Sequence, residues 1–340
     1  MNDEQAPEHD VRRRMVMLAA SFALVSCGGG GGGGSPAPAP TPATSTPPPP
    51  TPVPSPPSPP PTPTPTPTPA PTPAPVPGPA PLKSSKRGVA YNFATLADLQ
   101  AVSLGVSWWY NWGAHPDNAL PANAAAQAAA DYVPMLWNAS YDAASVTAYV
   151  KANNIKYLLV LNEPNLVDQA NMTPAQAAAA WPGYEAVAAA TGAKIVGPAI
   201  TWGTMAGYAD PVVWMDAFIV AYKAANGNRN PQIDYLAFHW YDYGLAAQLD
   251  RLTKYGKPFW VTEMANWHNG DGTAAIDTLA KQEAQMTDMV KTCEDRADVF
   301  RYAWFTGRWP SDAHFTSLLG ANGVLTPLGS LYMTLPFTAA

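Results

Sequence analysis

Short apolar runs alternate with alanine-rich, helix-patterned stretches through residues 86–340, and this alternation constrains the fold more than any other feature of the chain. Each apolar run is too short for a helix that would bury the same residues, so it is predicted to be a buried strand. Eight such runs occur, at residues 88–91, 106–110, 132–137, 157–161, 194–196, 235–239, 259–262 and 299–305. Eight strand–helix units in about 255 residues match an α/β fold of the (β/α)8 TIM-barrel class.

Helix signals lie between these strands. Thr173 and Asp210 each precede a proline, and their side chains are suited to cap the first turn of a helix. Gly227 is predicted to end the second of these helices, because glycine adopts the left-handed conformation found there.

Residues 1–27 read as a targeting segment. Three arginines at residues 12–14 precede an apolar run at residues 15–25, and the run leads into Leu-Val-Ser-Cys at Cys27. An apolar run of this length is shorter than the span of about 20 residues that crosses a bilayer as a helix. The ending resembles the lipobox of bacterial lipoproteins, which predicts acylation at Cys27; an ordinary cleaved signal is the alternative.

Residues 28–85 form a low-complexity segment of Gly, Pro and Thr, in which 25 of the 39 prolines lie between Pro36 and Pro81. At about 3.1 Å per residue in polyproline geometry, residues 36–82 reach on the order of 145 Å when fully extended. This segment is predicted to be a disordered linker that holds residues 86–340 away from the anchor. The expected location is the bacterial cell envelope, lipid-anchored at the outer membrane or cell surface, or secreted.

Composition argues against nucleic acid and favours a neutral ligand. The net charge is −6, only 13% of residues are charged, and the sequence has no Lys/Arg cluster beyond Arg14. The chain has 12 Trp and 15 Tyr, whose rings suit stacking on an amphipathic ligand such as a sugar. Tryptophans within strands are more often core residues, so Trp108, Trp260 and Trp304 are predicted to be buried.

Polar and aromatic residues follow the predicted strands at their carboxyl ends, which meet at one face of a barrel. Glu163 follows the strand at 157–161, where Pro164 stops the ladder, and Glu263 follows the strand at 259–262. The residues predicted to bind substrate at the same face are Asn92, Asn111, Trp112, Trp137, Asn162, Trp202, His239, Trp240, Tyr241 and Trp267.

Two carboxyl groups in one pocket are what glycoside hydrolysis needs. One protonates the leaving oxygen, and the other attacks the sugar or activates water. A single Glu after a strand is more often a surface or helix-starting residue, but the pair favours a catalytic site. Asn162 is a candidate donor to the sugar 2-hydroxyl, and His239 and Tyr241 are candidates to keep the attacking carboxylate ionised.

Seven motifs, in order through residues 86–305, resemble those of glycoside hydrolase family 128. They begin at Lys86, Tyr110, Tyr132, Leu161, Gln169, His239 and Tyr255 and read KRGVAYN, YNWG, YVPMLW, LNEPN, QANM, HWYD and YGKP. The resemblance implies a retaining β-1,3-glucan hydrolase on a clan A barrel, with Glu163 as acid/base and Glu263 as nucleophile. Family members often follow the nucleophile with an aromatic residue, whereas this chain has Met264, so the wall near Glu263 is expected to differ.

The expected activity is endo-hydrolysis of β-1,3-glucan of the laminarin or curdlan type by a monomer. One alternative is a barrel glycosidase on another β-linked glycan, such as xylan or mixed-linkage glucan. Another is a non-catalytic glucan-binding module, against which the two glutamates argue because binding requires neither.

Neither a metal nor a cofactor is expected. His115, His268 and His314 show no zinc-ligand spacing with one another or with acidic residues. Cys293 lies in an amphipathic helical stretch, and with Cys27 acylated it has no disulfide partner. We predict that Cys293 is a buried structural thiol.

Overall fold

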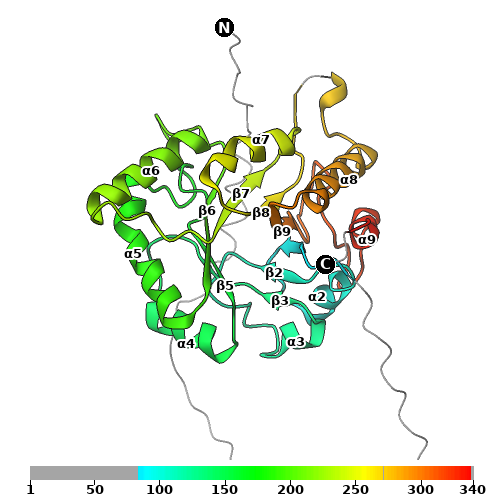
Figure 1. The fold of residues 1–340 in the computed structure, drawn as a ribbon. Coiled ribbons are helices and arrows are strands. Elements are labelled where there is room, and N and C mark those ends of the chain that lie inside the picture. Colours follow the sequence, from blue (N-terminus) through cyan, green and yellow to red (C-terminus); the bar gives the residue numbers. More distant parts are fainter. Residues whose placement is uncertain (1–82, 271, 338–340) are drawn as a thin grey trace, which may run out of the picture. The chain divides into compact units, whose positions relative to one another are not determined.

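The computed structural model describes residues 83–270 and 272–337 (Figure 1). The predicted targeting segment, the acylation site at Cys27 and nearly all of the predicted linker at 28–85 lie outside these residues. Among the described helices, none combines the length and the apolar character needed to span a membrane.

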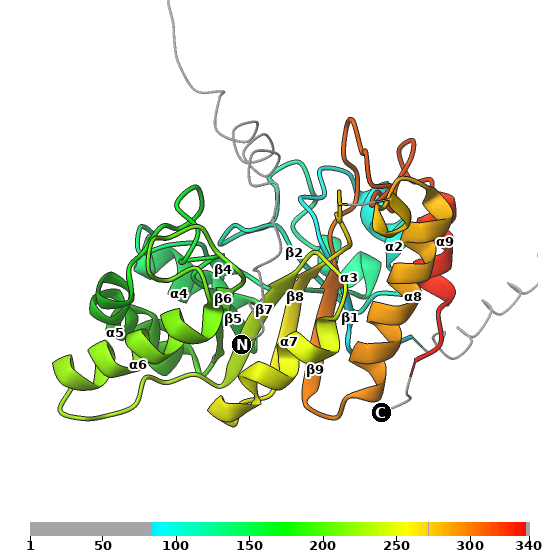
Figure 2. The same cartoon turned by 90° about the horizontal axis from the view of Figure 1, so that it is seen from above.

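Nine parallel strands form one sheet at the centre of the described chain. They are β1 (Arg87–Ala90), β2 (Trp108–Tyr110), β3 (Asp131–Tyr132), β4 (Met135–Leu136), β5 (Tyr157–Val160), β6 (Lys194–Ile200), β7 (Tyr235–Trp240), β8 (Phe259–Met264) and β9 (Val299–Trp304). Their order in the sheet is β3-β2-β1-β9-β8-β7-β6-β5-β4. Figures 1 and 2 show a curled, barrel-like sheet with helices outside it. The predicted α/β class and the strand positions are confirmed at this level.

The predicted strand at 132–137 is divided into β3 and β4 by Val133 and Pro134. Pro134 has no N–H group to donate to a ladder, so regular pairing stops there. β3 pairs with β2, whereas β4 pairs with β5. The two ends of the sheet order are therefore consecutive in the chain.

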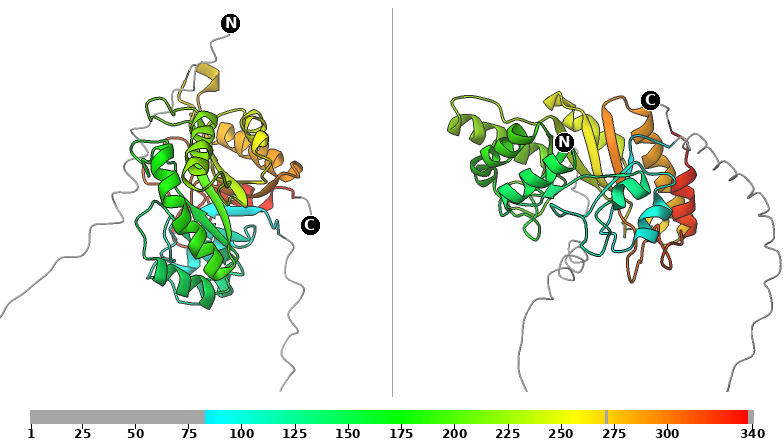
Figure 3. Two further views of the ribbon diagram at one scale, coloured as in Figure 1. Left: turned by 60° about the vertical axis from the view of Figure 1, so that its left-hand side comes forward. Right: turned by 90° about the horizontal axis from the view of Figure 1, so that it is seen from below.

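Helices cover the outside of the sheet. They are α2 (Leu96–Val102), α3 (Ala124–Ala128), α4 (Ala143–Ala152), α5 (Pro174–Thr191), α6 (Pro211–Ala225), α7 (Leu245–Leu252), α8 (Leu279–Asp295) and α9 (Pro327–Thr334), with the 3₁₀ turns η3 (Thr253–Tyr255) and η4 (Gly272–Ala274). Figure 3 shows α5 and α6 side by side, where Trp181 packs 4.9 Å from Phe218 between ring centres.

The predicted helix caps are confirmed. Thr173 forms a capping box with Gln176 at the start of α5, and the Asp210 carboxylate accepts a hydrogen bond from Val212 N at the start of α6. α6 ends at Ala225, and Gly227 follows with a φ of +60°. These local signals are readable from sequence because each depends on residues within one helical turn.

The predicted core residues are buried. Trp108, Trp260 and Trp304 are each 0% exposed, in β2, β8 and β9. Cys293 in α8 is a free, fully buried cysteine, and burial raises the pKa of its thiol, so it is the inert structural thiol that was predicted.

Both ends of the described chain are held at the amino ends of the strands. Lys83 Nζ donates to the carbonyl oxygens of Ser103 and Ala129, which precede β2 and β3. Arg87, the first residue of β1, donates to the carbonyl oxygen of Tyr332 in α9 and to that of Leu335. These contacts place the start of the domain opposite the carboxyl ends of the strands.

Candidate active site

Glu163 and Glu263 meet at the carboxyl ends of the strands, together with His239 from β7. An oxygen of each carboxylate and a ring nitrogen of His239 all lie within 4.8 Å of one another. The three residues are buried, with 2%, 4% and 0% of their surfaces exposed respectively. Two strand ends that are 100 positions apart in the sequence therefore form one site, as their positions after predicted strands indicated.

The backbone around Glu163 leaves the sheet through an unusual conformation. Leu161 and Glu163 have φ angles of +56° and +44°, in the left-handed region that side chains other than glycine disfavour. Strain of this kind costs about 1–3 kcal/mol per residue and persists where neighbouring contacts hold it. Here Glu163 N donates to Ala199 O at 2.8 Å, and Leu161 N donates to Leu136 O at 2.9 Å. The glutamate is thus fixed between β4 and β6.

Three uncharged groups donate hydrogen bonds to the Glu263 carboxylate. Tyr110 OH and the indole Nε1 of Trp112 lie 2.9 and 2.8 Å from Oε1, and Tyr241 OH donates to Oε2. Burial, followed by the charge of Glu263, raises the pKa of Tyr110 well above its usual value, so Tyr110 keeps its proton and remains a donor. Donors of this kind favour the ionised carboxylate, which is the form a nucleophile needs.

His239 lies between the two glutamates. Its Nδ1 is 2.9 Å from Glu163 Oε1 and 3.4 Å from Glu263 Oε2, and its Nε2 is 2.9 Å from Thr262 Oγ1. A proton on Nδ1 makes the ring a donor to Glu163 Oε1, with the Thr262 hydroxyl donating to Nε2, and Glu263 Oε2 lies beside the same nitrogen. The ring therefore connects the two acids through one atom.

The same three residues are close enough to hold a metal ion. The oxygen atoms involved already accept the hydrogen bonds of His239, Tyr110, Trp112 and Tyr241. A cation bound there would have to replace these neutral donors. The expectation that the site uses no metal stays a prediction.

The comparisons with known proteins point to one family. A family profile described as a glycosyl hydrolase catalytic core matches residues 88–332. The crystal structure of a GH128 subgroup II endo-β-1,3-glucanase from Pseudomonas viridiflava is 59% identical, with a TM-score of 0.75 over 76% of this chain and 100% of that one. The chain belongs to glycoside hydrolase family 128. It is a glycoside hydrolase, as the motifs predicted.

More distant relatives of this family 128 chain differ in coverage. A subgroup I endo-β-1,3-glucanase from Amycolatopsis mediterranei, solved in complex with laminaritriose, is 26% identical with a TM-score of 0.58 and matches 74% of this chain and all of that one. Alkali-sensitive linkage protein 1 of Schizosaccharomyces pombe is 24% identical over 269 residues, which cover 74% of this chain. The family 128 chain spans only 45% of the length of this curated relative.

Asn92 and Asn111, predicted to bind substrate, bond to each other at the mouth of the family 128 site. Asn92 Nδ2 donates to Asp117 Oδ2 at 2.7 Å, and Asn111 Nδ2 donates to Asn92 Oδ1 at 2.9 Å. Asn162 is 3% exposed next to Glu163, and its amide nitrogen lies 3.2 Å from Gln169 Oε1. Its Oδ1 is buried with no hydrogen-bond partner among the described residues, so Asn162 has bonding capacity to offer a ligand.

The tryptophans predicted at the rim occupy different environments. Trp112 bonds to Glu263, and Trp267 stacks on Tyr241 with ring centres 4.1 Å apart. Trp202 is half-buried under the guanidinium of Arg251, and Trp137 is half-buried at the end of β4. Trp240 is only 2% exposed, and its indole N–H donates to Tyr243 O. Trp240 therefore packs inside the family 128 domain.

The residue after Glu263 faces away from the site. Met264 is 0% exposed, and its Sδ lies 3.9 Å from Cys293 Sγ in α8. The aromatic wall beside Glu263 comes instead from Tyr241 and the Trp267 ring stacked on it.

The sequence did not identify Tyr110 as a site residue, because the last residue of a buried strand looks like a core residue.

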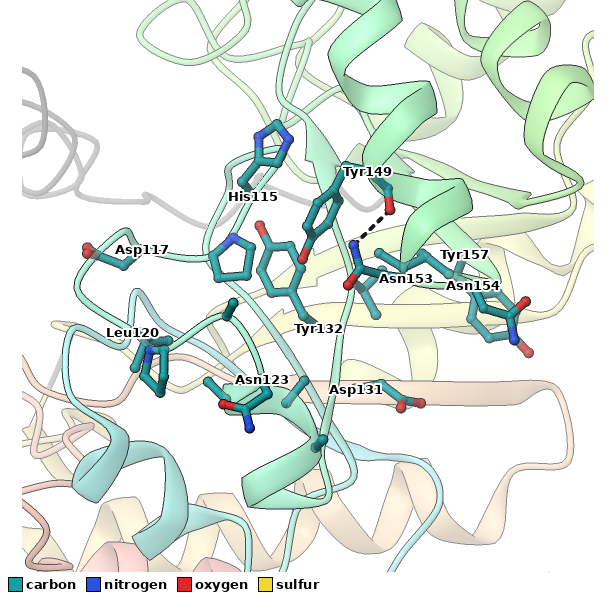
Figure 4. A pocket seen from close by; sticks show the side chains of 18 of the residues that line it. His115, Asp117, Leu120, Asn123, Asp131, Tyr132, Tyr149, Asn153, Asn154 and Tyr157 are labelled. Atoms are coloured by element: carbon teal, nitrogen blue, oxygen red, sulfur yellow. Dashed lines mark hydrogen bonds between the residues drawn. The ribbon is translucent and has the colours of Figure 1, made fainter.

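A cavity of about 960 Å³ lies on the flank of the domain, between α3 and α4 (Figure 4). Tyr132 and Tyr149 line it together with asparagines and Asp131. Neither glutamate contributes to its lining, so this cavity is separate from the site formed by Glu163, Glu263 and His239. A smaller hollow lies beside Asn138, Ala170 and Met172, next to the loop that follows Glu163.

We expect Trp240→Ala to lower the free energy of unfolding by about 3–5 kcal/mol, because the truncation leaves a cavity in a buried region. Trp202→Ala removes a half-exposed ring from the same face and should cost clearly less. Urea unfolding followed by circular dichroism measures both values. Equal losses for the two variants would contradict the placement of Trp240 in the core.

Proposed function

We propose that the chain is an endo-β-1,3-glucanase that retains the configuration of the anomeric carbon. The observation that carries this proposal is the close approach of Glu163 and Glu263, whose oxygens come within 4.8 Å of each other. Retaining glycosidases separate their carboxyl groups by about 5–5.5 Å, whereas inverting enzymes need about 6.5–9.5 Å to admit a water molecule. The short separation supports direct attack by a carboxylate.

The hydrogen bonds divide the roles between the two acids. Glu263, with three neutral donors, is the nucleophile that forms the bond to the anomeric carbon. Glu163 gives its proton to the departing oxygen and then takes a proton from the water that releases the sugar. His239 lies against both carboxylates and holds their relative positions through the two steps.

The substrate class follows from the relatives. The structure that is 59% identical is an endo-β-1,3-glucanase, and the relative from Amycolatopsis mediterranei binds laminaritriose. The part-exposed rings of Trp112, Trp137, Trp202 and Trp267 supply apolar faces suited to sugar rings. We therefore assign glucan binding to this rim, with Asn162 as the candidate contact of the 2-hydroxyl.

Backbone hydrogen bonds around Val133 and Pro134, between β3 and β4, support an eight-stranded TIM barrel. Val133 N donates to Trp109 O, and Leu159 N donates to Pro134 O, each at 3.0 Å. The residues between β3 and β4 thus continue both neighbouring ladders, and the two short strands act as halves of one. On this assignment the barrel is closed, with its site at the carboxyl ends of the strands.

We also propose that the enzyme is a monomer attached to the bacterial envelope through an acylated Cys27, with residues 28–85 as a tether. The support is the order of three arginines, an apolar run and Leu-Val-Ser-Cys in the sequence. A single acyl chain binds membranes weakly, so stable attachment requires the further acyl chains that lipoprotein processing adds.

Glu263→Gln is expected to abolish hydrolysis of laminarin, because an amide cannot take the place of the attacking carboxylate. Glu163→Gln should lower the rate of laminarin hydrolysis by about 10²–10⁴-fold. The same variant should lose far less rate on an aryl glucoside, because that leaving group needs no protonation. Release of reducing ends measures both. Glu185→Gln, in α5, changes a part-buried carboxylate that pairs with Arg229 at 2.7 Å; it is the matched control and should keep full activity per folded molecule.

The stereochemistry of the first product tests the retaining mechanism independently of the variants. Proton NMR during early hydrolysis should show the β-anomer appearing first. An initial α-anomer would assign an inverting mechanism, and undiminished hydrolysis by Glu263→Gln would end the assignment of the nucleophile.

Laminarin and curdlan should yield a ladder of oligosaccharides, whereas lichenan and xylan should be cleaved slowly or not at all. Chromatography of the products from all four glycans makes the comparison. Release of glucose alone from curdlan would indicate exo-cleavage. Efficient cleavage of xylan would point to another β-glycan, and binding without products would favour a glucan-binding module.

Cys27→Ala should move the protein from the membrane fraction to the soluble fraction of a bacterium that processes lipoproteins. Fractionation with immunoblotting measures the shift, and mass spectrometry of the wild-type protein should show acyl chains on Cys27. An unmodified Cys27, or an unchanged distribution of the variant, would contradict the lipid anchor.

A further inference from the structure

One hydroxyl group contacts both neighbours of Trp112 in the chain. Tyr132 OH lies 2.6 Å from Asn111 Oδ1 and 2.7 Å from the carbonyl oxygen of Gly113. Trp112 itself has a φ of +63°, a left-handed conformation that is rare for a bulky side chain. Such backbone strain persists only where surrounding contacts hold it, and the single proton of the Tyr132 hydroxyl is shared between these two acceptors, one on each side of Trp112.

This strained backbone determines where the Trp112 indole points. Its Nε1 donates to Glu263 Oε1 at 2.8 Å, alongside the donor from Tyr110. A relaxed backbone at Trp112 would rotate the side chain away from the nucleophile. Tyr132 has no hydrogen bond to either glutamate among the described contacts, so any effect that it has on Glu263 is transmitted through Trp112.

A chain of hydrogen bonds fixes the direction of every group in this arrangement. The Asp117 carboxylate only accepts, so Asn92 must turn its amide nitrogen toward Asp117 and its oxygen toward Asn111. Asn111 then directs its nitrogen to Asn92 and its oxygen to Tyr132. The direction of each hydrogen bond is thus determined, from the Asp117 carboxylate at one end to the Tyr132 hydroxyl at the other.

Asn111 has no capacity left for a ligand in this arrangement. Its amide nitrogen donates to Asn92 Oδ1 and, at 3.1 Å, to His115 O. Its oxygen accepts from Gly113 N at 3.1 Å as well as from Tyr132. The amide therefore serves to brace the turn after β2.

The Tyr132 side chain is itself firmly placed. It is 5% exposed, and its ring packs 4.7 Å from Trp109 between centres. Burial raises the pKa of Tyr132 well above its usual value, so the hydroxyl stays protonated across the working pH range. Figure 4 shows Tyr132 beside Tyr149 among the residues that line the flank cavity.

We propose that Tyr132 is a positioning residue for hydrolysis, which holds the turn at Asn111 and Gly113 so that Trp112 keeps its N–H on the nucleophile Glu263. The inference rests on the proposed function only in taking Glu263 as the nucleophile. It assigns a role in the reaction to a side chain that lines a different cavity.

Tyr132→Phe keeps the ring and removes only the hydroxyl. The expected result is a fall in kcat of about tenfold, roughly the value of one hydrogen bond, with KM changed less than about twofold. Tyr149→Phe, which removes a neighbouring hydroxyl from the same cavity, is the control and should leave both quantities unchanged.

A double-variant cycle tests whether the effect passes through Trp112. Trp112→Phe removes the indole N–H, so adding Tyr132→Phe to it should lower kcat by less than about twofold more. A further tenfold loss in the double variant would overturn the proposal. So would a Tyr132→Phe enzyme whose kcat and KM both match those of Tyr149→Phe.

Two further measurements separate this proposal from a folding defect and from a wrong substrate. Concentrations of active enzyme come from titration with a mechanism-based inhibitor, so a loss of folded protein does not count as a loss of kcat. Rates are taken on whichever glycan the wild-type enzyme cleaves fastest. An error in the assigned substrate would therefore leave the comparison of variants intact.

Discussion

The placement of the Glu263 carboxylate out of water, among neutral hydrogen-bond donors, is the constraint on which the site depends. A buried charge is costly unless hydrogen bonds replace its hydration. The donors come from β2, the turn after it and the loop after β7. Because β1 and β9 separate β2 from β8 in the sheet, Tyr110 reaches Glu263 only across the interior of the curled sheet. The curvature of the fold and the chemistry of the site are therefore linked.

Local patterns in the sequence were sufficient to predict much of the fold. Apolar runs located every strand, and capping residues located α5 and α6, because these signals act within a few residues. β6 was predicted to end at Val196, and Gly197 and Pro198 follow that residue. In the structure it continues to Ile200, with a register shift between Val196 and Ala199 where it pairs with β7. The neighbouring strand overrode the local signal.

Contacts between distant residues were beyond the reach of such patterns. Glu163 and Glu263 were found because each ends a strand, but nothing near Tyr110 or Tyr132 distinguishes a buried tyrosine that packs from one that organises a site. Asn111 was predicted to bind substrate from its place after a strand. Its four hydrogen-bond partners, which occupy the whole amide, include Asn92 from the loop after β1 and Tyr132 from β3. The functions of these residues depend on how the curled sheet brings separate strand ends together.

The contacts of Lys83 and Arg87 have a consequence for how the domain faces its surroundings. Both residues lie at the amino ends of the strands, and the glutamates lie at the carboxyl ends. Lys83 therefore enters the domain at the end opposite the two glutamates. Contacts made on the face around Lys83 and Arg87 therefore leave the opposite face, where the strands end at the two glutamates, uncovered.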